Sequence, residues 1–333
     1  MTGRTEHVVT FTAPEKAELV DLAPDPRPLD PAEVTGPTRV SLVSPGTEIG
    51  GSYVGPKFPA QPGYAAVFEV QAVGADVKDL RPGDLAFCTG PMGIGGHRSR
   101  QRCQREAAIP VPPGLSPEVA VHARLMNVTM STLTTTVARP PDKVLVTGLG
   151  PVGHLGAQIF QSCGYQVMAV DPVESRRRMA REKGIRDVRA AVPLDDRTAL
   201  ADTALVLECS AHEQAILDGC KAVRKRGEVV LVGVPRKRRT ELYAFDIVQT
   251  VFQRYVVLRS GWEWEVSRYA ADFRVGSVFG NIAGALRWLQ EGRVNVDGLY
   301  ATADPKDCQQ VYQDLMHQRL EALSVVFDWG RAA

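Results

Sequence analysis

Clustered cysteines are missing from this sequence. None of the six forms a C-x-x-C pair; they are Cys88, Cys103, Cys163, Cys209, Cys220 and Cys308. A disulfide framework of a secreted protein, or a zinc lobe held by four cysteines, requires clustered spacing. We therefore expect free thiols in a protein of the reducing cytoplasm.

Long apolar runs are missing as well. The N-terminal stretch MTGRTEHVVTFTAPEKAELV contains no apolar core of the length that a signal peptide needs. No segment approaches the roughly 18 consecutive apolar residues of a membrane-spanning helix. We expect neither a secretion signal nor a membrane partner.

Neither sign of charge is in excess, because 39 Lys and Arg residues stand against 38 Asp and Glu residues. This balance creates no global field that would attract nucleic acid or an anionic membrane. The basic runs Arg176–Arg178 and Arg236–Arg239 are short, and we interpret them as solvated surface. The expected partner is therefore a small molecule, with no nucleic acid.

The chain has 333 residues, of which 44% are apolar, and this length favours about two domains. The first ~115 residues predict short β segments between Pro and Gly turns, closer to a small barrel than to a layered sheet. Expected strands there are 38–43, 65–72 and 85–88.

Beyond Ser116-Pro117-Glu118 the pattern changes, because a capping residue, a proline and an acid begin a helix. Strands are expected at 144–146, 166–170, 204–207, 228–232 and 255–258, and helices at 152–161, 174–183 and 212–223. This alternation predicts βαβ units and a parallel sheet with helices on both faces. Helices at 282–290 and 305–316 and a strand at 324–327 end the chain.

The most informative motif is Gly148-x-Gly150-x-x-Gly153, which follows a strand and begins an amphipathic helix. Gly148 permits a tight turn, Gly150 lets a pyrophosphate approach the backbone, and Gly153 allows close packing of helix and strand. The N–H groups at the helix start then face the phosphates. The motif predicts a nicotinamide-dinucleotide site, to which Pro151 and Val152 contribute.

Asp171 ends the next strand and distinguishes between the two nicotinamide cofactors. A carboxylate there accepts hydrogen bonds from the ribose hydroxyls and repels a 2′-phosphate, which favours NAD(H). Arg176 and its neighbours favour NADP(H) instead, because a guanidinium near the ribose can bind the 2′-phosphate. Both cofactors therefore remain open. We also count Cys209, Gly233 and Val234 among the cofactor-binding residues, although a plain turn explains Gly233-Val234-Pro235 almost as well.

Together these patterns predict an α/β protein in which a doubly wound Rossmann sheet is inserted into a β-rich domain. The expected boundaries are 121–277 for the dinucleotide-binding domain, and 1–120 plus 278–333 for the substrate domain. Open parallel sheets bind ligands beyond the carboxyl ends of their strands, so that edge is the expected cofactor site.

The chain resembles the medium-chain dehydrogenase/reductases, the superfamily of the zinc alcohol and polyol dehydrogenases, over nearly its whole length. The branch with the most similar motifs is the bacteriochlorophyllide dehydrogenase-like group. The resemblance rests on Ser44-Pro45-Gly46-Thr47-Glu48, Pro62-Gly63-Tyr64-Ala65, Arg81-Pro82-Gly83-Asp84, the glycine motif 147–153 and Glu291-Gly292-Arg293-Val294. It implies an oxidoreductase whose β-rich domain is GroES-like and carries the catalytic residues.

The chain departs from the zinc members of this superfamily at the metal ligands. Pro45 stands where their cysteine lies (or Ser44, if the alignment shifts by one), and Tyr64-Ala65 replaces their His-Glu. The stretch 121–126, where a third ligand would fall, offers only His122. Zinc needs three protein ligands from Cys, His, Asp or Glu, so we expect no zinc.

Four residues are therefore candidates for the chemistry. Tyr64 is the first candidate for a proton donor, with a core aromatic as the equal alternative. Thr47 matches the family position whose hydroxyl relays a proton. Glu48 would bind a substrate hydroxyl, or else orient its turn, and His122 would face the cleft, although a structural role is the commoner one.

Two further patterns carry less weight. If the segment 97–102 forms a strand, its three arginines lie on one face of that strand. They could then bind an anionic group of the substrate, or, more simply, form a solvated strand at the edge of a sheet. Trp262 and Trp264 follow the strand 255–258, which in this superfamily lies at the sheet edge that pairs two subunits, so we expect a homodimer.

Three functions remain open at this point. The first is zinc-independent interconversion of a small alcohol, polyol, cyclitol or natural-product intermediate with its ketone. The second is NAD(P)H-dependent reduction of an activated C=C bond in an enone or quinone. The third is a non-catalytic relative that only binds the dinucleotide.

Overall fold

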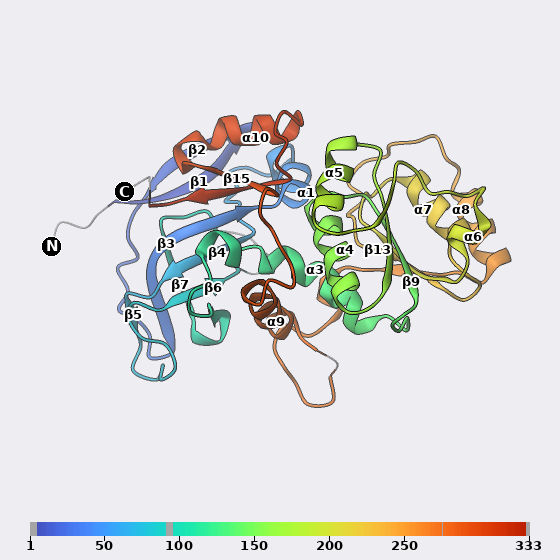
Figure 1. Ribbon diagram of the computed structural model, residues 1–333. Coiled ribbons are helices and arrows are strands. Elements are labelled where there is room, and N and C mark those ends of the chain that lie inside the picture. Colours follow the sequence, from blue (N-terminus) through green and yellow to red (C-terminus); the bar gives the residue numbers. More distant parts are fainter. Residues whose placement is uncertain (1–4, 91–95, 275, 331–333) are drawn as a thin grey trace. The chain divides into compact units, whose positions relative to one another are not determined.

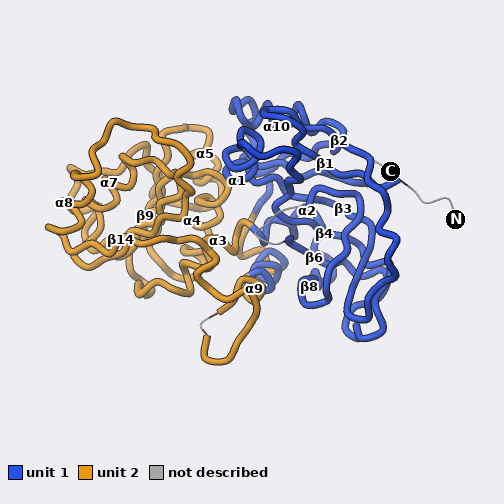
Figure 2. Tube along the Cα trace, turned by 180° about the vertical axis from the view of Figure 1, so that it is seen from behind, with its two compact units in different colours: residues 1–124, 282–290, 296–333 blue, residues 125–281, 291–295 orange. Residues whose placement is uncertain are grey.

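The computed structural model describes residues 5–90, 96–274 and 276–330. The chain separates into two compact units, shown in different colours in Figure 2. Unit 1 holds Met1–Arg124, Ile282–Gln290 and Val296–Ala333, and unit 2 holds Leu125–Asn281 and Glu291–Asn295. Unit 2 therefore begins at Leu125 and interrupts unit 1 along the sequence.

Unit 2 is built on a six-stranded sheet in which every neighbouring pair is parallel. The strand order is β11-β10-β9-β12-β13-β14. The order reverses at β9, which lies between β10 and β12, and such a reversal is where open sheets bind ligands. The strands are β9 (Lys143–Thr147), β10 (Gln166–Val170), β11 (Asp187–Arg189), β12 (Thr203–Glu208), β13 (Glu228–Leu231) and β14 (Val257–Ser260).

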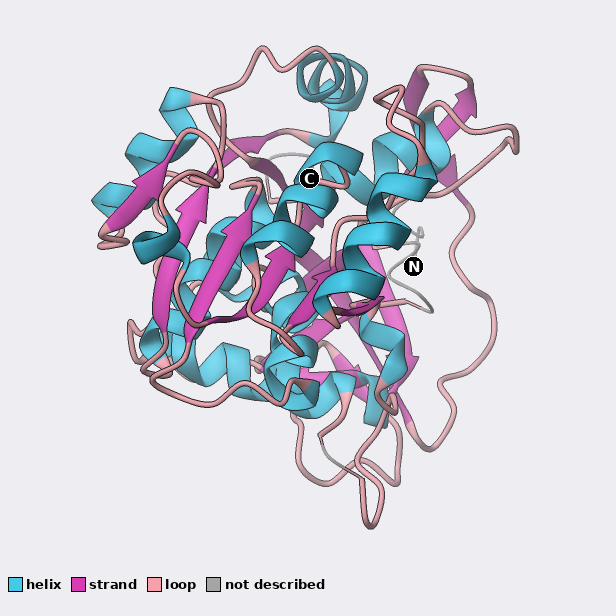
Figure 3. Ribbon diagram, turned by 90° about the vertical axis from the view of Figure 1, so that its right-hand side faces the viewer, coloured by secondary structure: helices cyan, strands magenta, loops and turns pink. Residues whose placement is uncertain are grey.

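Helices pack on this sheet because its central strands are apolar on both faces. All six residues of β12 are buried, and α4 contacts β9 and β10 while α7 contacts β12 and β13. Figure 3 shows these strands side by side among the helices. The helices of this part are α3 (Ala123–Thr135), α4 (Pro151–Ser162), α5 (Glu174–Glu182), α6 (Arg197–Leu200), α7 (Glu213–Ala222) and α8 (Ala244–Arg254).

Unit 1 consists mainly of β structure. Its eight-stranded sheet runs β15-β16-β3-β4-β6-β8, with β5 and β7 paired to β3. A separate hairpin, β1 (Glu6–Ala13) with β2 (Lys16–Leu22), is covered by α10 (Cys308–Met316), as Figure 1 shows. The sheet strands are β3 (Glu33–Val43), β4 (Ala65–Glu69), β5 (Ala72–Val73), β6 (Leu85–Cys88), β7 (Arg100–Gln104), β8 (Ala108–Pro110), β15 (Tyr300–Ala303) and β16 (Ser324–Asp328).

An aromatic cluster forms the core beneath the hairpin of unit 1. Phe11, Tyr53, Tyr312 and Phe327 are each fully buried, and the ring centroids of Phe11 and Tyr312 lie 4.8 Å apart. Such edge-to-face pairs add to the area-dependent stabilisation of a core. The short helices of this unit are α1 (Pro45–Glu48) and α2 (Pro117–Ala120), with a π-helical turn at Ile49–Tyr53. The longer α9 (Val278–Gln290) begins in unit 2 and continues in unit 1 from Ile282.

The predicted fold class is confirmed, including the parallel sheet and the β-rich unit. The predicted bounds of three elements were wrong, because turns interrupt or shift these segments. The segment 65–72 is divided between β4 and β5, and the 305–316 helix begins with a 3-10 turn at Pro305–Asp307. The last strand of unit 2 was predicted two residues early, because Tyr255 ends α8 with φ of 56° and cannot extend a strand.

Two expectations about location can be compared with the structure. No helix among the described residues has both the length and the apolar character required to cross a membrane. All six cysteines are free, and Cys88, Cys220 and Cys308 are buried.

Candidate functional site

The glycine turn between β9 and α4 depends on two glycines that tolerate no side chain. Gly148 has φ of +86°, and a Cβ there would lie 2.8 Å from the Cβ of Ser210. A Cβ on Gly153 would lie 1.9 Å from the carbonyl oxygen of Gly148. The turn therefore folds back on the helix start at a distance that only glycine permits, as the sequence motif predicts.

Gly150 differs from both, because a Cβ there would meet no protein atom within 4 Å. It is the N-cap of α4, with φ of −66° and ψ of −177°, a conformation open to any residue. The first N–H groups of a helix have no intrahelical acceptor, and Pro151 has no N–H at all. The space in front of Gly150 thus faces the N–H groups of Val152 and Gly153, which suits a pyrophosphate.

Asp171 holds this turn from the end of β10. Its side chain is 1% exposed, and its two oxygens accept hydrogen bonds from the N–H groups of Leu149 at 2.7 Å and Val173 at 2.8 Å. A guanidinium nitrogen of Arg176 lies 3.5 Å from Oδ2. Each carboxylate oxygen has two lone pairs, so the acid retains acceptor capacity for ribose hydroxyls.

The loops after β12 and β13 meet beside the glycine turn. The N–H of Cys209 donates to the carbonyl of Thr147 at 2.8 Å, and a Cβ on Gly233 would lie 2.6 Å from the nitrogen of Ala211. The structure therefore brings Gly148, Cys209 and Gly233 together at the carboxyl edge of the sheet. Val234 is 51% exposed at the end of this loop.

Glu208 is a buried acid at the same edge that sequence reasoning missed. Its carboxylate accepts hydrogen bonds from the N–H groups of Ser210 at 2.8 Å and Ala211 at 3.1 Å, and from the Ser210 hydroxyl. Burial raises the pKa of Glu208 above its ordinary value. It shapes the loop that carries Cys209, and its position directly after an apolar strand, like that of Asp171, was the available signal.

Thr47 and Glu48 lie in α1, directly after β3 in unit 1. Thr47 is half-buried, and its hydroxyl is 3.2 Å from the hydroxyl of Ser44. Glu48 is only 3% exposed, and its Oε1 accepts the backbone N–H of Ser44 at 2.9 Å. The acid turns back into the core while the threonine stays at its border.

The other oxygen of Glu48 belongs to a buried hydrogen-bond network. Oε2 lies 3.1 Å from Nε2 of His97 and accepts the hydroxyl of Tyr312. Burial, and then the neighbouring Glu48 charge, raises the pKa of Tyr312 well above its ordinary value, so the phenol stays protonated as a donor. With its oxygens engaged in the core, Glu48 fits the role of orienting the turn rather than that of binding a substrate hydroxyl.

The network continues from His97 to Ser41 and Trp329. The indole N–H of Trp329 donates to Oγ of Ser41 at 2.8 Å, and Oγ lies 2.7 Å from Nδ1 of His97. The network therefore links Glu48 through His97 and Ser41 to Trp329. His97 and Tyr312 are 49 and 264 residues away from Glu48 in the sequence, so no local sequence pattern could have predicted these contacts.

Tyr64 and His122 are both buried in unit 1. Tyr64 is 6% exposed, its carbonyl accepts the hydroxyl of Thr89 at 3.1 Å, and the guanidinium carbon of Arg124 lies 4.1 Å from its ring centre. Nδ1 of His122 donates to the Glu118 carbonyl at 2.8 Å, and its ring packs 4.7 Å from that of Tyr300. Arg124 was missed by sequence reasoning.

The arginines of the basic segment 97–102 pair with individual partners. Arg102 binds Glu33 at 2.5 Å, Arg100 lies 3.3 Å from Glu6, and Arg98 binds the side chain of Gln61 at 3.1 Å. The strand begins only at Arg100. This arrangement favours the simpler alternative, a solvated edge, because Arg100 and Arg102 are already paired with acids.

Among residues 5–90, 96–274 and 276–330, no group of three or more His, Cys, Asp or Glu side chains could hold a metal ion. At the positions that the resemblance assigns to zinc ligands, Pro45 begins α1 and Tyr64 precedes β4.

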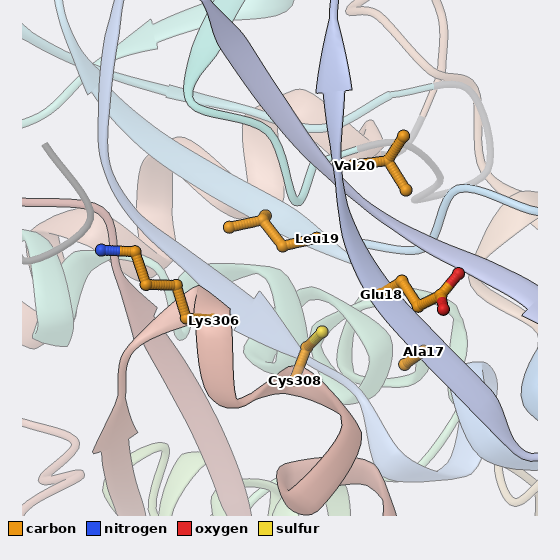
Figure 4. Close-up of a pocket in the computed structure, with 6 residues that line it drawn as sticks. All are labelled: Ala17, Glu18, Leu19, Val20, Lys306 and Cys308. Atoms are coloured by element: carbon orange, nitrogen blue, oxygen red, sulfur yellow. The ribbon is translucent and has the colours of Figure 1, made fainter.

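A surface depression in unit 1 is unrelated to these residues. Figure 4 shows it between β2 and the start of α10, lined by Ala17, Glu18, Leu19, Val20, Lys306 and Cys308. It contains none of the predicted site residues. Its one acid and one base give it no evident chemistry.

Two buried histidines predict a loss of stability in acid. Burial lowers the pKa of His122 and of His154, on α4, from 6.5 to about 4. Between these values the unfolded chain binds protons that the folded chain does not, so the free energy of unfolding falls as the pH falls from 6.5 toward 4. We expect a loss of about 2 kcal/mol per histidine between pH 7.5 and 5.

Urea unfolding at these two pH values measures this effect. His122→Gln should remove its share of the pH dependence, whereas His317→Gln, at an exposed position, should leave it unchanged. Equal free energies of unfolding at both pH values would contradict the burial argument.

Comparison with known proteins adds to this geometry. A family model described as zinc-binding dehydrogenase matches residues 151–270. An alcohol dehydrogenase of Geobacillus stearothermophilus is 25% identical over 214 residues, which are 55% of this chain and 63% of that protein. The alignment thus spans less than two thirds of that relative.

Two solved structures share the fold over nearly the whole chain. Galactitol-1-phosphate dehydrogenase from Escherichia coli has a TM-score of 0.80 at 16% identity, covering 97% of this chain and 99% of that one. Acetophenone reductase from Geotrichum candidum, in complex with NAD, has a TM-score of 0.79 at 19% identity, covering 98% of each chain. Together with the family model over residues 151–270 and the alcohol dehydrogenase relative, these structures show what the chain is similar to: the zinc-type alcohol dehydrogenase-like members of the medium-chain dehydrogenase/reductases.

Proposed function

We propose that this chain is an oxidoreductase that transfers hydride between a nicotinamide cofactor and a small alcohol, polyol, cyclitol or natural-product intermediate and its ketone. The observation that carries the proposal is the turn at 148–153. Two of its glycines pack too tightly for a side chain, and the third, Gly150, leaves open space before the N-terminus of α4. That combination suits a diphosphate rather than a structural turn alone.

We further propose a preference for NAD(H). Asp171 is anchored by the N–H groups of Leu149 and Val173, so its charge is held beside the turn. A 2′-phosphate on the adenosine ribose would meet this carboxylate. Arg176 lies 3.5 Å from Asp171, which partly neutralises its charge. It would therefore attract the 2′-phosphate of NADP(H) only weakly.

In the proposed mechanism, the residues of this chain handle the proton. The nicotinamide, when bound, supplies or accepts the hydride. Tyr64 holds a phenolic proton that can be given to the substrate oxygen as negative charge develops there, and Thr47 relays a proton through its hydroxyl. Ser44, 3.2 Å from the Thr47 hydroxyl, orients that group.

The chemistry is proposed to run without zinc. Pro45 and Tyr64 occupy two of the three positions that the resemblance assigns to ligands, and neither binds zinc as a protein ligand ordinarily does. Metal analysis of the purified protein is expected to find well under one zinc per chain. One tightly held zinc per chain would overturn this part of the proposal.

Cofactor titration and substrate profiling test the function. NADH fluorescence should saturate at micromolar concentrations, with weaker binding of NADPH. A panel of ketones and matched enones then separates carbonyl reduction from C=C reduction. Binding without turnover of any substrate would favour the non-catalytic alternative, and no binding of either cofactor at millimolar concentrations would end the proposal.

We also propose a homodimer formed through the edge of the unit 2 sheet. β14 ends the strand order, and α8, which packs against α7, has no buried residue. The apolar side chains of this surface are strongly exposed: Phe245, Val248, Phe252, Tyr255 and Val257 are 46–82% accessible. An open strand edge beside exposed apolar side chains favours pairing with a second copy.

Light scattering after size exclusion tests the dimer. The unchanged chain should have twice the chain mass, and Val248→Glu with Phe252→Glu should weaken dimerisation by about 100-fold or more, because two charges would be buried. Val137→Glu, at a position 74% exposed elsewhere in unit 2, is the matched control. A monomer in the unchanged chain would refute the proposal.

A further inference from the structure

Arg124 is a buried cation beside the proposed proton donor. Its side chain is 0% exposed, the largest side chain among those fully buried in the described residues. It stands in the first turn of α3, and its guanidinium carbon lies 4.1 Å from the centre of the Tyr64 ring. Nothing in the sequence pattern separates it from the other arginines.

A guanidinium in this place is costly, because burial removes the hydration of its charge. Arginine does not lose its proton at any ordinary pH, so the charge is permanent. The negative face of an aromatic ring attracts a cation, most strongly where water is excluded. The contact with Tyr64 therefore offsets part of the cost of burial and packs the guanidinium against the ring.

The proposed reaction gives such a charge a role. Hydride transfer to a carbonyl carbon leaves negative charge on the oxygen, and the proton that neutralises it comes from Tyr64. The negative charge then passes to the phenol oxygen. A fixed cation against the same ring stabilises that charge without rearrangement, which is how preorganised charges lower a barrier.

We propose that Arg124 is a positioning residue for the reaction: it orients the Tyr64 ring and stabilises the negative charge that the phenol takes up when it gives its proton to the substrate. This inference rests on the proposed function. In this proposal, the Arg124 side chain supplies the positive charge that a metal ion supplies in the zinc members. The described residues contain no group of three metal ligands.

Substitutions at Arg124 test this role by kinetics. Arg124→Met keeps the length of the side chain and removes the charge, and we expect kcat to fall by about 10- to 100-fold with KM and the Kd for NADH within twofold. Arg124→Lys should recover part of kcat. Arg287→Met, at an exposed position of α9, is the control for loss of an arginine. An unchanged kcat in Arg124→Met would overturn the proposal.

A double substitution separates action through Tyr64 from a purely structural effect. In a Tyr64→Phe background, Arg124→Met should cause little further loss of kcat, because the charge would no longer have a phenolate to stabilise. An equal loss in both backgrounds would show that Arg124 acts independently of Tyr64. If Arg124→Met does not fold, the same cycle is run with Arg124→Gln, which also removes the charge but keeps a polar end.

A spectroscopic measurement decides the matter even if the protein turns over no substrate. The phenolate absorbance of Tyr64 is isolated as the difference between the unchanged chain and Tyr64→Phe during alkaline titration. Without the guanidinium, this signal should develop at higher pH. An unmoved titration would refute the inference alone, whereas failure of NADH to bind would refute the proposed function and leave this result standing.

Discussion

We expect Gly150→Asp to weaken NADH binding strongly while the protein keeps its fold. The backbone at Gly150 suits any residue and a side chain there meets no protein atom within 4 Å. Aspartate is moreover a favoured N-cap, so thermal stability should be unchanged or raised. The added carboxylate would occupy the space proposed for the pyrophosphate and repel it, and we expect the Kd for NADH to rise by about 100-fold or more, equivalent to about 2.7 kcal/mol.

NADH fluorescence titration and thermal unfolding measure the two effects separately. Gly150→Ser is the matched control, since it caps the helix without a charge and should weaken binding less than aspartate. Gly153→Ala should instead lower the melting temperature, because its Cβ would lie 1.9 Å from the Gly148 carbonyl oxygen. Wild-type affinity in Gly150→Asp would mean that the phosphates bind elsewhere.

The second large effect is expected at Tyr64 and Thr47. Tyr64→Phe and Thr47→Val each remove one hydroxyl and little volume, so the fold should persist. We expect kcat to fall by about 10²- to 10⁴-fold, the usual contribution of a positioned proton donor or relay. NADH affinity should stay within twofold, because neither residue belongs to the glycine turn.

Steady-state kinetics on a substrate identified by the carbonyl panel measure this loss. Tyr243→Phe, at a tyrosine that is 78% exposed, controls for the substitution itself. If both variants retain full turnover, Tyr64 and Thr47 do not handle the proton. Loss in only one of them would assign the role to that residue.

The geometry of the glycine turn could be predicted because its determinants are local. Gly148, Gly150 and Gly153 lie within one turn, and the strand before them and the helix after them follow from hydrophobic periodicity. Asp171 then follows at a spacing imposed by one βαβ unit, and the structure places its carboxylate 2.7 Å from the turn at Leu149. Glu208 is likewise an acid at the carboxyl end of a strand, β12, but no glycine motif precedes it that would have marked it as a candidate.

The surroundings of the candidate residues in unit 1 depend on contacts that no local pattern encodes. Glu48 reaches Tyr312 across 264 residues, and the pairing is possible only because α10 packs beside the core of unit 1. Arg124 resembles any other arginine in a list of residues, yet its burial against Tyr64 makes it exceptional. How deeply a residue is buried and which side chains it contacts depend on how the unit packs, and they cannot be read from the residue type alone.

The sequence by itself determined the fold class and the glycine turn between β9 and α4, because steric limits on the glycine backbone and the period of apolar residues act over a few neighbours. Only the tertiary structure decided that Glu48 turns into the core and that Arg124 lies under Tyr64. Those outcomes depend on which distant side chains exclude water from a charge, and that is settled when the whole unit packs.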